Sequence, residues 1–529
     1  MERWTPRVGL SAQEKILIKR LARVRTLFAF FRLHRHELFD DGFQEQLESM
    51  YRTTGAGLEP HAPAFLCMVL LLQGYVGASD AEAVELSVVD LRWQMCLDCI
   101  GIEAPPFSQG ALQLFRERMV AHDMDRILLE RTVELVRSGV MTEKEKHAVT
   151  KSLRVAVDSR PLAGAGRVED TINLLGHAAR SIVQLVSKLT ERAPEDICRK
   201  AGIPLLLAPS IKAGLDIDWS DPKQKAMAIE LVERQVSSLQ RWVDRHLDDV
   251  VFEPLRPYID AITQVRDQDL ESSKNGALQI RKGVAAERRI SIQDTEMRHG
   301  RKSKSKRFDG YKEHIARDLD FHAIVACAVT PANRPEEEGA VPIAEDIRRQ
   351  KLRLVELHID RGYVNSPVVD AVFAAGGTVL AKPWAQPAPR PGLFTKRDFK
   401  IDLRAHAITC PAGEVETFEP GVTVPFDPET CGPCALRSQC TQAACGKGRT
   451  VSIAVDEDRQ KEFRKLQQTK PGRAQLRKRT SVEHALAHIA ARKGHRARYI
   501  GVRRNLFDLR RAAAIQNLEG IHFILRHAA

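Results

Sequence analysis

The stretch LRVAVDS at residues 153–159 decides the fold of this chain. Val155 and Val157 alternate in a short β-branched run that ends on an acid, Asp158, and this pattern predicts a core strand with a carboxylate at its end. Helical patterns at 341–349 and 368–375 separate further strand patterns at 311–315, 322–330, 352–360 and 378–382. Strands that alternate with helices predict an α/β fold, with a mixed or parallel sheet covered by helices.

Helical patterns fill much of the remaining chain. Residues 14–125 form one helical region, in which short helices expected at 79–97 and 108–119 suit either a helix-turn-helix DNA reader or a plain helical bundle. A second helical region follows the first strand. Its apolar stripe around Ile229 predicts packing within the chain or contact with a second subunit.

These patterns divide the chain into five expected segments. They are an N-terminal helical domain at 1–150 with a candidate role in binding DNA ends, the first part of the α/β core at 151–165 and 305–385, a helical insertion at 166–290, a cysteine-rich module at 386–452, and a C-terminal helical part of the core at 453–529.

Composition and charge narrow the class of protein. The chain has 529 residues, 43% of them hydrophobic and 28% charged, which excludes a disordered or fibrous protein and predicts several domains. Its net charge of +12 favours a polyanionic partner, with nucleic acid as the first candidate. Residues 1–10 lack the apolar core of a secretory signal, and the apolar run at 64–76 is shorter than the roughly 20 residues that a membrane span needs. We therefore expect a cytoplasmic protein.

A second acid, Asp360, ends the strand pattern of residues 352–360 as Asp158 ends the first. If the two strands are neighbours, both carboxylates emerge at one edge of the sheet. Carboxylate oxygens are the ligands that hard ions such as Mg²⁺ prefer, and such ions catalyse phosphodiester chemistry. Each acid also has an ordinary interpretation as a turn or cap residue.

Four short motifs, taken in order, resemble the spaced signature of DDE transposases of bacterial insertion sequences. They are VAVDS at 155–159, FDGYK at 308–312, PAN at 331–333 and IDRGY at 359–363, and the order and character match from about residue 60 to the C-terminus. The resemblance implies an RNase H-like core. It also implies a third carboxylate on a helix, Glu483, preceded by Arg479 on the same helical face. Glu462 is an available substitute for Glu483.

The resemblance implies that Mg²⁺ or Mn²⁺ is held by Asp158, Asp360 and Glu483. It also implies that the protein cleaves DNA at the element ends and that the freed 3'-hydroxyl then attacks target DNA. A homodimer on DNA and a location at the bacterial nucleoid are implied too. The family often carries a Tyr three residues before the Arg and a Lys seven after the Glu, where this chain has Leu476 and Ala490. Two alternatives stay open: a metal-dependent nuclease without strand transfer, and a catalytically silent DNA-binding protein.

Two further groups of residues are candidate sites. Basic stretches at 298–312 and 461–511 are expected near the metal site, and the DNA contacts expected from them and their surroundings are Lys312, Arg479, Arg492, Lys493, Arg496 and Arg498. Cys410, Cys431, Cys434 and Cys440 provide four thiolates in two arms, a pattern that predicts structural Zn²⁺, with Cys445 as an alternative ligand. Reduced structural cysteines are the competing interpretation.

Overall fold

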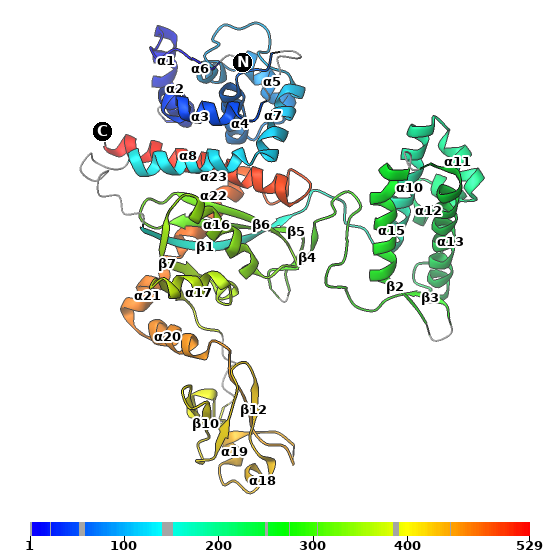
Figure 1. The fold of residues 1–529 in the computed structure, drawn as a ribbon, viewed down its shortest axis with the longest axis vertical. Coiled ribbons are helices and arrows are strands. Elements are labelled where there is room, and N and C mark those ends of the chain that lie inside the picture. Colours follow the sequence, from blue (N-terminus) through cyan, green and yellow to red (C-terminus); the bar gives the residue numbers. More distant parts are fainter. Residues whose placement is uncertain are drawn as a thin grey trace. The chain divides into compact units, whose positions relative to one another are not determined.

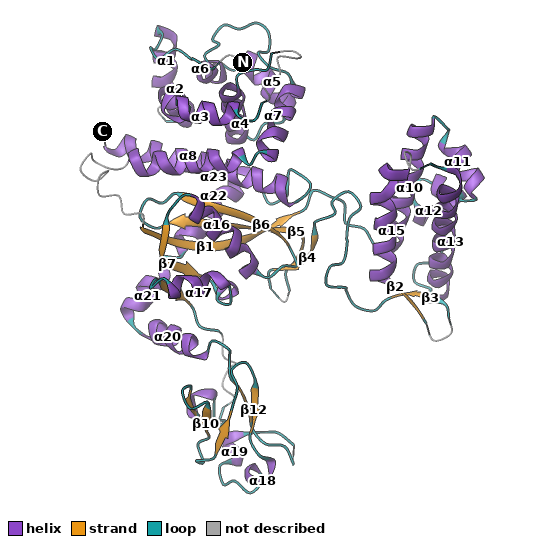
Figure 2. Ribbon diagram, in the orientation of Figure 1, coloured by secondary structure: helices purple, strands orange, loops and turns teal. Residues whose placement is uncertain are grey.

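The computed structural model describes residues 3–21, 23–51, 59–139, 152–248, 252–273, 276–303, 305–384, 391–444 and 446–528. The chain divides into two compact units. The first unit comprises Met1–Leu354 with Ser481–Ala529, and the second unit is Val355–Thr480. The fold is mixed α/β and contains both antiparallel and parallel strand pairs (Figures 1 and 2).

The sheet of the first unit is built on two long strands, β1 (Ser152–Ala163) and β5 (Arg307–Asp318). They pair antiparallel, from Val155 opposite Asp318 to Ala163 opposite Gly310. On its other edge, β5 pairs with β4 (Arg298–Arg301) over its first residues and with β6 (Ile324–Pro331) over the rest. Strand β4 was not expected, because its basic sequence has the composition of a loop.

Gly310, within the FDGYK motif, is required by the close approach of β1. Its φ is 145°, and a Cβ on it would lie 2.3 Å from the backbone nitrogen of Gly164 and 2.3 Å from the carbonyl oxygen of Leu162. Any larger residue would push the two strands apart at this point. The glycine therefore fixes how closely the end of β1 approaches the start of β5.

Helices of the first unit cover this sheet. Strand β6 is buried from Ile324 to Val329, and it contacts α16 (Ala340–Arg349), α8 (Met124–Gly139) and α23 (Val502–Ala528). Figure 1 shows α8 and α23 side by side along their length. The strands predicted at 311–315 and 322–330 and the helix at 341–349 are confirmed, with β5 extending further on both sides.

The N-terminal part of the first unit is all helical. Its other helices are α1 (Ala12–Arg20), α2 (Leu27–Leu38), α3 (Asp41–Glu48), α4 (Pro63–Val76), α5 (Asp80–Val89), α6 (Leu91–Leu97) and α7 (Gln109–Ala121). The side chains of Ser79 and Ser108 cap α5 and α7, which confirms the short helices expected there. In the described part of the chain, no single helix is long and apolar enough to cross a membrane; α4 and α5 reach that length only as a pair bent by 102°.

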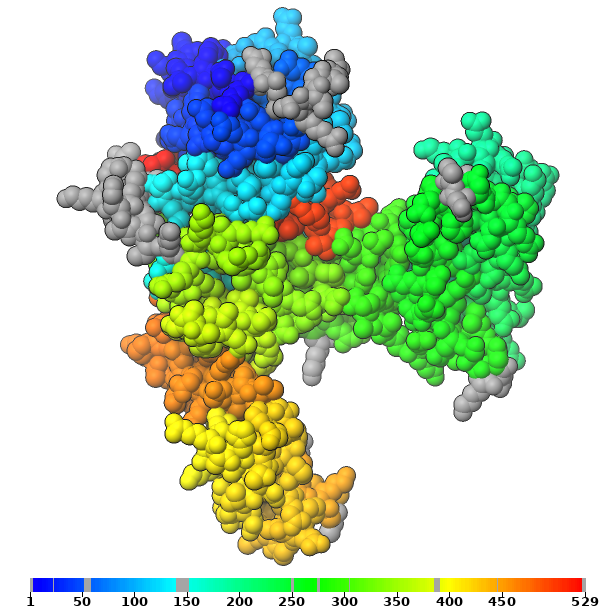
Figure 3. Space-filling view, viewed as in Figure 1, coloured from blue at the N-terminus to red at the C-terminus, as the bar shows by residue number. Residues whose placement is uncertain are grey.

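A helical insertion with its own core follows β1 (teal to green in Figure 3). Its helices are α10 (Thr171–Thr190), α11 (Pro194–Ala201), α12 (Ile211–Leu215), α13 (Pro222–His246) and α15 (Arg256–Asp269), and a hairpin of β2 (Leu270–Ser272) and β3 (Leu278–Ile280) follows. The stripe of α13 that includes Ile229, Val236 and Val243 is buried in this core. The contact with a second subunit that this stripe allowed is therefore wrong, because α10 and α11 already cover it.

The second unit combines a small α/β part with the cysteine module. Strand β7 (Arg353–Ile359) pairs parallel with β8 (Thr378–Ala381), and α17 (Pro367–Ala374) connects them, all as predicted. The module contains short strands that the sequence did not indicate: β9 (Lys400–Asp402), β10 (Ala407–Thr409), β11 (Val415–Thr417), β12 (Thr423–Pro425) and β13 (Thr450–Ser452). Helices α20 (Glu457–Gln468) and α21 (Lys470–Arg477) follow it.

Candidate active site

Asp158 lies inside β1, and not at the end of the strand as the sequence predicted. The strand continues because Arg160 and Leu162 keep pairing with β5, opposite Glu313 and Tyr311. Asp158 itself is half-buried, and its Oδ1 accepts a hydrogen bond of 2.8 Å from the backbone N–H of Ser159. The carboxylate is thus oriented by its own backbone.

Asp360 follows the last residue of β7, so the strand-end position predicted for it is confirmed. It caps a short 3₁₀ turn, η4 (Arg361–Tyr363), and its Oδ1 accepts a hydrogen bond of 2.8 Å from the N–H of Arg361. It is half-buried, like Asp158, and held by the same kind of contact to the next residue. Asp360 belongs to the second unit, whereas Asp158 belongs to the first.

Glu483 lies in the first turn of α22 (Thr480–Lys493), where it is exposed. Arg479 is the residue directly before this helix, four positions before Glu483, so the shared face of the two residues stays a prediction. The competing acid, Glu462, is on α20 and forms an ion pair with Lys465, with its Oε1 2.7 Å from Nζ.

Helix α22 is attached to β5 at its N-terminal end. Arg317 of β5 donates a hydrogen bond of 2.5 Å from Nη1 to the carbonyl oxygen of Ser481. In the antiparallel register, Arg317 stands opposite Ala156 of β1, on the face that also carries Asp158. The apolar side of the helix, formed by Val482, Ala485, Leu486 and Ile489, is buried.

The C-terminal end of α22 is attached to β1. Gly494, with a φ of 79°, follows the helix, and Arg160 donates from Nη1 to its carbonyl oxygen at 3.1 Å. The chain then pairs with the end of β1: Ala163 donates to the carbonyl oxygen of His495 at 2.9 Å, and Ala497 donates to that of Ala163 at 2.6 Å. Helix α22 therefore runs along β1, on the face of the strand that carries Asp158.

Glu483 of α22 and Asp158 of β1 each lie close in sequence to a partner of Arg317. From Ser481 to Glu483 the helix rises about 3 Å, and from Ala156 to Asp158 the strand rises about 7 Å. Glu483 follows Ser481 by two residues and Asp158 follows Ala156 by two residues, so both acids lie near the part of their element at which Arg317 makes its contact. The first unit thus supplies two of the three predicted carboxylates from neighbouring elements.

One comparison with known protein families bears on this region. Residues 410–522 match the family model of the transposase DDE domain, and this range contains α22 with Glu483. Searches of curated proteins and of solved structures found no match to this chain. The family match supports the resemblance of the sequence motifs to DDE transposases.

The basic residues expected to contact DNA differ in how far they are exposed. Arg496 and Arg498 are exposed, although each also donates to a backbone carbonyl, of Ala165 and of Ala78. Arg479 is half-buried. These three remain available as predicted DNA contacts.

Three other basic residues are engaged inside the protein. Lys493 lies between Glu313 and Asp508 with 8% of its side chain exposed, so the DNA contact predicted for it is wrong. Arg492 forms an ion pair with Glu519. Lys312 donates from Nζ to the carbonyl oxygen of Arg334, and burial lowers the pKa of its ammonium group.

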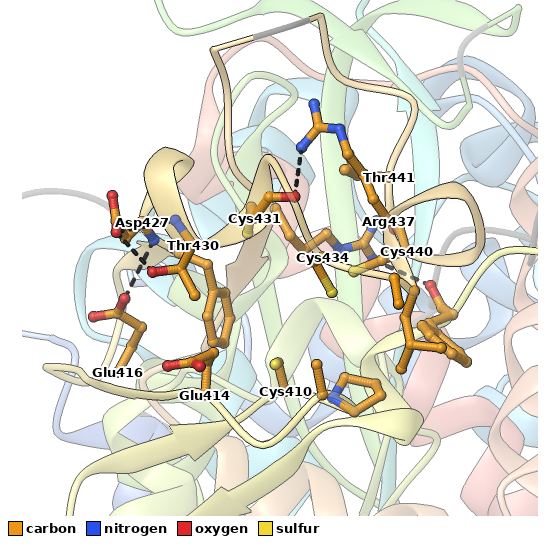
Figure 4. A pocket seen from close by; sticks show the side chains of 17 residues that line it. Cys410, Glu414, Glu416, Asp427, Thr430, Cys431, Cys434, Arg437, Cys440 and Thr441 are labelled. Atoms are coloured by element: carbon orange, nitrogen blue, oxygen red, sulfur yellow. Dashed lines mark hydrogen bonds between the residues drawn. The ribbon is translucent and has the colours of Figure 1, made fainter.

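The cysteine module gathers its four predicted ligands around one pocket. Figure 4 shows Cys410 after β10 facing the segment that carries Cys431, Cys434 and Cys440. Arg437 fixes this segment by donating to the carbonyl oxygens of Cys431, Ala443, Ala444 and Lys447. Cys445, the alternative ligand, lies outside the described residues.

The thiols of this pocket influence one another. Burial raises the pKa of Cys440, and the negative charges of the neighbouring thiolates of Cys431, Cys410 and Cys434 raise it further, while Arg449 opposes them. A bound cation would relieve this repulsion. As they stand, however, the residues that the structure describes contain no group of three or more His, Cys, Asp or Glu side chains that could hold a metal ion.

Sequence reasoning missed Arg160 and Glu313, which join β1 to β5 beneath α22. Glu313 is fully buried, and its Oε2 accepts a hydrogen bond of 2.6 Å from Nε of Arg160. The available signal was a charged residue two positions after Asp158, on the same face of a strand that is otherwise apolar. Charged residues at buried strand positions are paired, so Arg160 indicated that an acidic partner lies nearby.

Proposed function

We propose that this protein is the transposase of a bacterial insertion sequence, which cleaves DNA at the element ends and joins the freed ends to target DNA. The proposal is supported by the DDE domain match and by the attachment of α22, the helix of Glu483, to Arg317 of β5 and Arg160 of β1, which share one face of the sheet with Asp158. Asp360 completes the set as the acid of the IDRGY motif. An RNase H-like core is part of this proposal.

The three carboxylates form a suitable ligand set for Mg²⁺ or Mn²⁺, because hard divalent ions select carboxylate oxygens held on rigid elements. Asp158 is fixed by a paired strand and Asp360 by a strand end, and each is oriented by the backbone N–H that follows it. Such ions would stabilise the oxygens that attack and leave phosphorus during phosphoryl transfer. The protein's own contribution is to hold each of the two aspartates in a fixed orientation on its own element.

DNA would approach this site along the exposed cations that follow α22. Arg496 and Arg498 are exposed beside the end of β1, and Arg479 immediately precedes the helix. Contacts of this kind bind phosphates and position the backbone without reading the bases. Joining two ends requires both to be held together, so a homodimer on DNA, associated with the bacterial nucleoid, belongs to the proposal.

The decisive experiment compares the wild type with Asp158→Ala on a DNA duplex that carries an element end. We expect Mg²⁺-dependent nicking by the wild type and none by the variant, with DNA affinity retained. Nicking that survives the substitution would reject the assigned site. A wild type that nicks but never joins the 3'-end to a second duplex would favour the alternative of a nuclease without strand transfer. Binding without nicking would favour a catalytically silent DNA-binding protein.

We also propose that the cysteine module binds structural Zn²⁺. Four thiols around one pocket, with the pKa of Cys440 raised by its neighbours, support this assignment. Zinc sites in small modules commonly assemble as the metal binds. Elemental analysis of the purified protein should find about one zinc per chain. A wild type without zinc, in which all four thiols react with a thiol reagent before any chelator is added, would identify them as reduced structural cysteines.

A further inference from the structure

A chain of buried ion pairs lies under the C-terminal end of α22. Lys493 is the last residue of the helix, and its Nζ lies 2.6 Å from Oε1 of Glu313 and 2.8 Å from Oδ2 of Asp508. The three side chains are 8%, 0% and 4% exposed. One ammonium group therefore joins α22 to β5 and to α23 in the interior of the first unit.

The chain of charges continues on both sides of Lys493. Arg160 of β1 shares Glu313, with Nε 2.6 Å from Oε2. Arg511 of α23 donates from Nη2 to Oδ1 of Asp508 at 2.7 Å, and from Nη1 to Oε1 of Gln73 on α4 at 2.9 Å. Positive and negative groups alternate, so each carboxylate lies between two cations. We call Arg160, Glu313, Lys493, Asp508 and Arg511 the buried ion network.

The pKa values of Lys493 and Asp508 are both shifted toward the charged form by their neighbours in the network. Burial alone would lower the pKa of Lys493, but Asp508 and Glu313 outweigh burial and raise it. Burial would raise the pKa of Asp508, but Lys493 and Arg511 hold it well below its usual range. Loss of one partner would leave an uncompensated charge in the interior, which is far more costly than loss of an exposed ion pair.

The location of the network connects it with the two carboxylates of the first unit. Arg160 lies two residues after Asp158 on the same face of β1, and Lys493 lies ten residues after Glu483 on the same helix. A helix transmits a shift at one end to the other as a rigid rod. At its N-terminal end α22 has the contact of Arg317 with Ser481. The end of the helix where Lys493 lies is the one that buried ion pairs attach to β5 and α23.

We propose that Lys493 is a positioning residue, which fixes α22 on β1 and β5 through Glu313 and Asp508 and so holds Glu483 at the separation from Asp158 that metal binding requires. This inference rests on the proposed role of Asp158 and Glu483. It assigns to Lys493 a function inside the protein, which agrees with its burial. Groups that orient metal ligands from behind typically change metal affinity by 10- to 100-fold when they are removed.

The test uses Lys493→Met in the full chain, with Arg32→Met as the matched control. Arg32 forms an ion pair with Glu14 that is equally buried, with side chains 2% and 0% exposed, in the N-terminal helices. In Lys493→Met we expect faster amide hydrogen exchange in residues 484–494 and roughly tenfold weaker Mn²⁺ binding, measured from the electron paramagnetic resonance signal of free Mn²⁺. Arg32→Met should lower the melting temperature and leave Mn²⁺ affinity unchanged.

A second variant keeps the test valid if Lys493→Met does not fold. Lys493→Met combined with Asp508→Asn leaves Glu313 paired with Arg160 and Arg511 paired with Gln73. This double variant should fold and still bind Mn²⁺ about tenfold more weakly. Wild-type Mn²⁺ affinity in either folded variant, or an equal loss in Arg32→Met, would overturn the positioning role.

The same measurements separate this inference from the proposed function. If Asp158→Asn binds Mn²⁺ as tightly as the wild type, the assigned metal site is wrong. The exchange rates of residues 484–494 in Lys493→Met then decide whether the network positions the helix. Unchanged exchange would overturn that claim independently of any metal.

Discussion

The contact between α22 and β1 and the cysteine module keep their chemically important side chains in place in different ways. Along α22, backbone pairing at Ala163, the contact of Arg317 and the buried ion network fix the helix on the strand. The module has a core of seven buried apolar residues, and its four cysteines are only half-buried around a pocket. The first arrangement is complete without a ligand, whereas in the second the proposed zinc would draw the thiols together and add stability.

The difference teaches what each region demands of its sequence. A site fixed by buried charges needs particular partners on several elements, and each substitution there disturbs the others. A site closed by a metal needs only its ligands and a flexible scaffold of turns. Substitution of an exposed acid such as Glu483 should leave the fold of the first region intact, while substitution of a cysteine in the second should change its structure.

The largest effect is expected from Glu483→Gln. This change keeps the size of the side chain on an exposed helical position but removes the negative charge, so nicking of an element end should fall roughly a thousandfold, the loss of several kcal/mol of electrostatic stabilisation. Single-turnover nicking rates at saturating DNA measure this loss. Circular dichroism and the melting temperature should stay at wild-type values.

Glu462→Gln provides the control for this prediction. Glu462 is also an exposed helical glutamate and forms an ion pair with Lys465, so its loss should change nicking less than twofold. If Glu462→Gln abolishes nicking and Glu483→Gln does not, the third carboxylate has been assigned to the wrong helix.

The next largest effect concerns the module. Cys434→Ser should remove bound zinc and expose residues 391–452 to proteolysis, because the apolar core of the module is small. Limited trypsin digestion followed by mass spectrometry measures the cleavage sites. Cys327→Ser, at a buried cysteine of β6, is the control: it should retain the zinc and leave the module resistant. Equal protection of the module in both variants would contradict a structural zinc.

The smallest effect is a pH dependence of the first unit. His314 of β5 is fully buried beside Thr330, and burial, assisted by the charge of Lys312, lowers its pKa to about 3. In the unfolded chain its pKa is about 6.5, so the unfolded state binds the proton first and folding stability is lost as the pH falls below 6.5. We expect the free energy of unfolding to fall by about 1.4 kcal/mol per pH unit between pH 6 and pH 4 from this residue alone.

Urea denaturation of the wild type and of His314→Asn at several pH values checks this prediction. The variant should be less stable at pH 7.5 but should lose less stability between pH 6.5 and pH 5. Parallel losses in the two proteins would show that His314 does not govern the acid response.

Much of the α/β core could be predicted because its signals are local. The alternation of Val155 and Val157 indicated β1, and the patterns before Asp360 and after Thr378 indicated β7 and β8 with a helix between them. The capping residues Ser79 and Ser108 indicated the starts of two helices correctly. In each case neighbouring residues alone determine the structure.

The rest depends on contacts between distant residues. The end of β1 was placed too early because only the pairing with β5, more than 140 residues later, shows that the strand continues past Asp158. Lys493 was assigned to the DNA surface because its partners, Glu313 and Asp508, lie on other elements. Arg479 was placed on the helix of Glu483 because the start of α22 carries no clear capping signal in the sequence.

The pairing of Ala163 with residues 495–497 has a consequence for the order in which this protein matures. The strand that carries Asp158 is synthesised early, but its supporting helix emerges more than 300 residues later. Domains fold in the order in which they are synthesised, and synthesis proceeds at roughly 5 to 20 residues per second. About 15 s or longer therefore pass between the synthesis of β1 and the synthesis of that helix. A ribosome-bound chain that has not yet reached α22 therefore lacks both Glu483 and the frame that supports it, so the proposed site stays incomplete until synthesis is nearly finished.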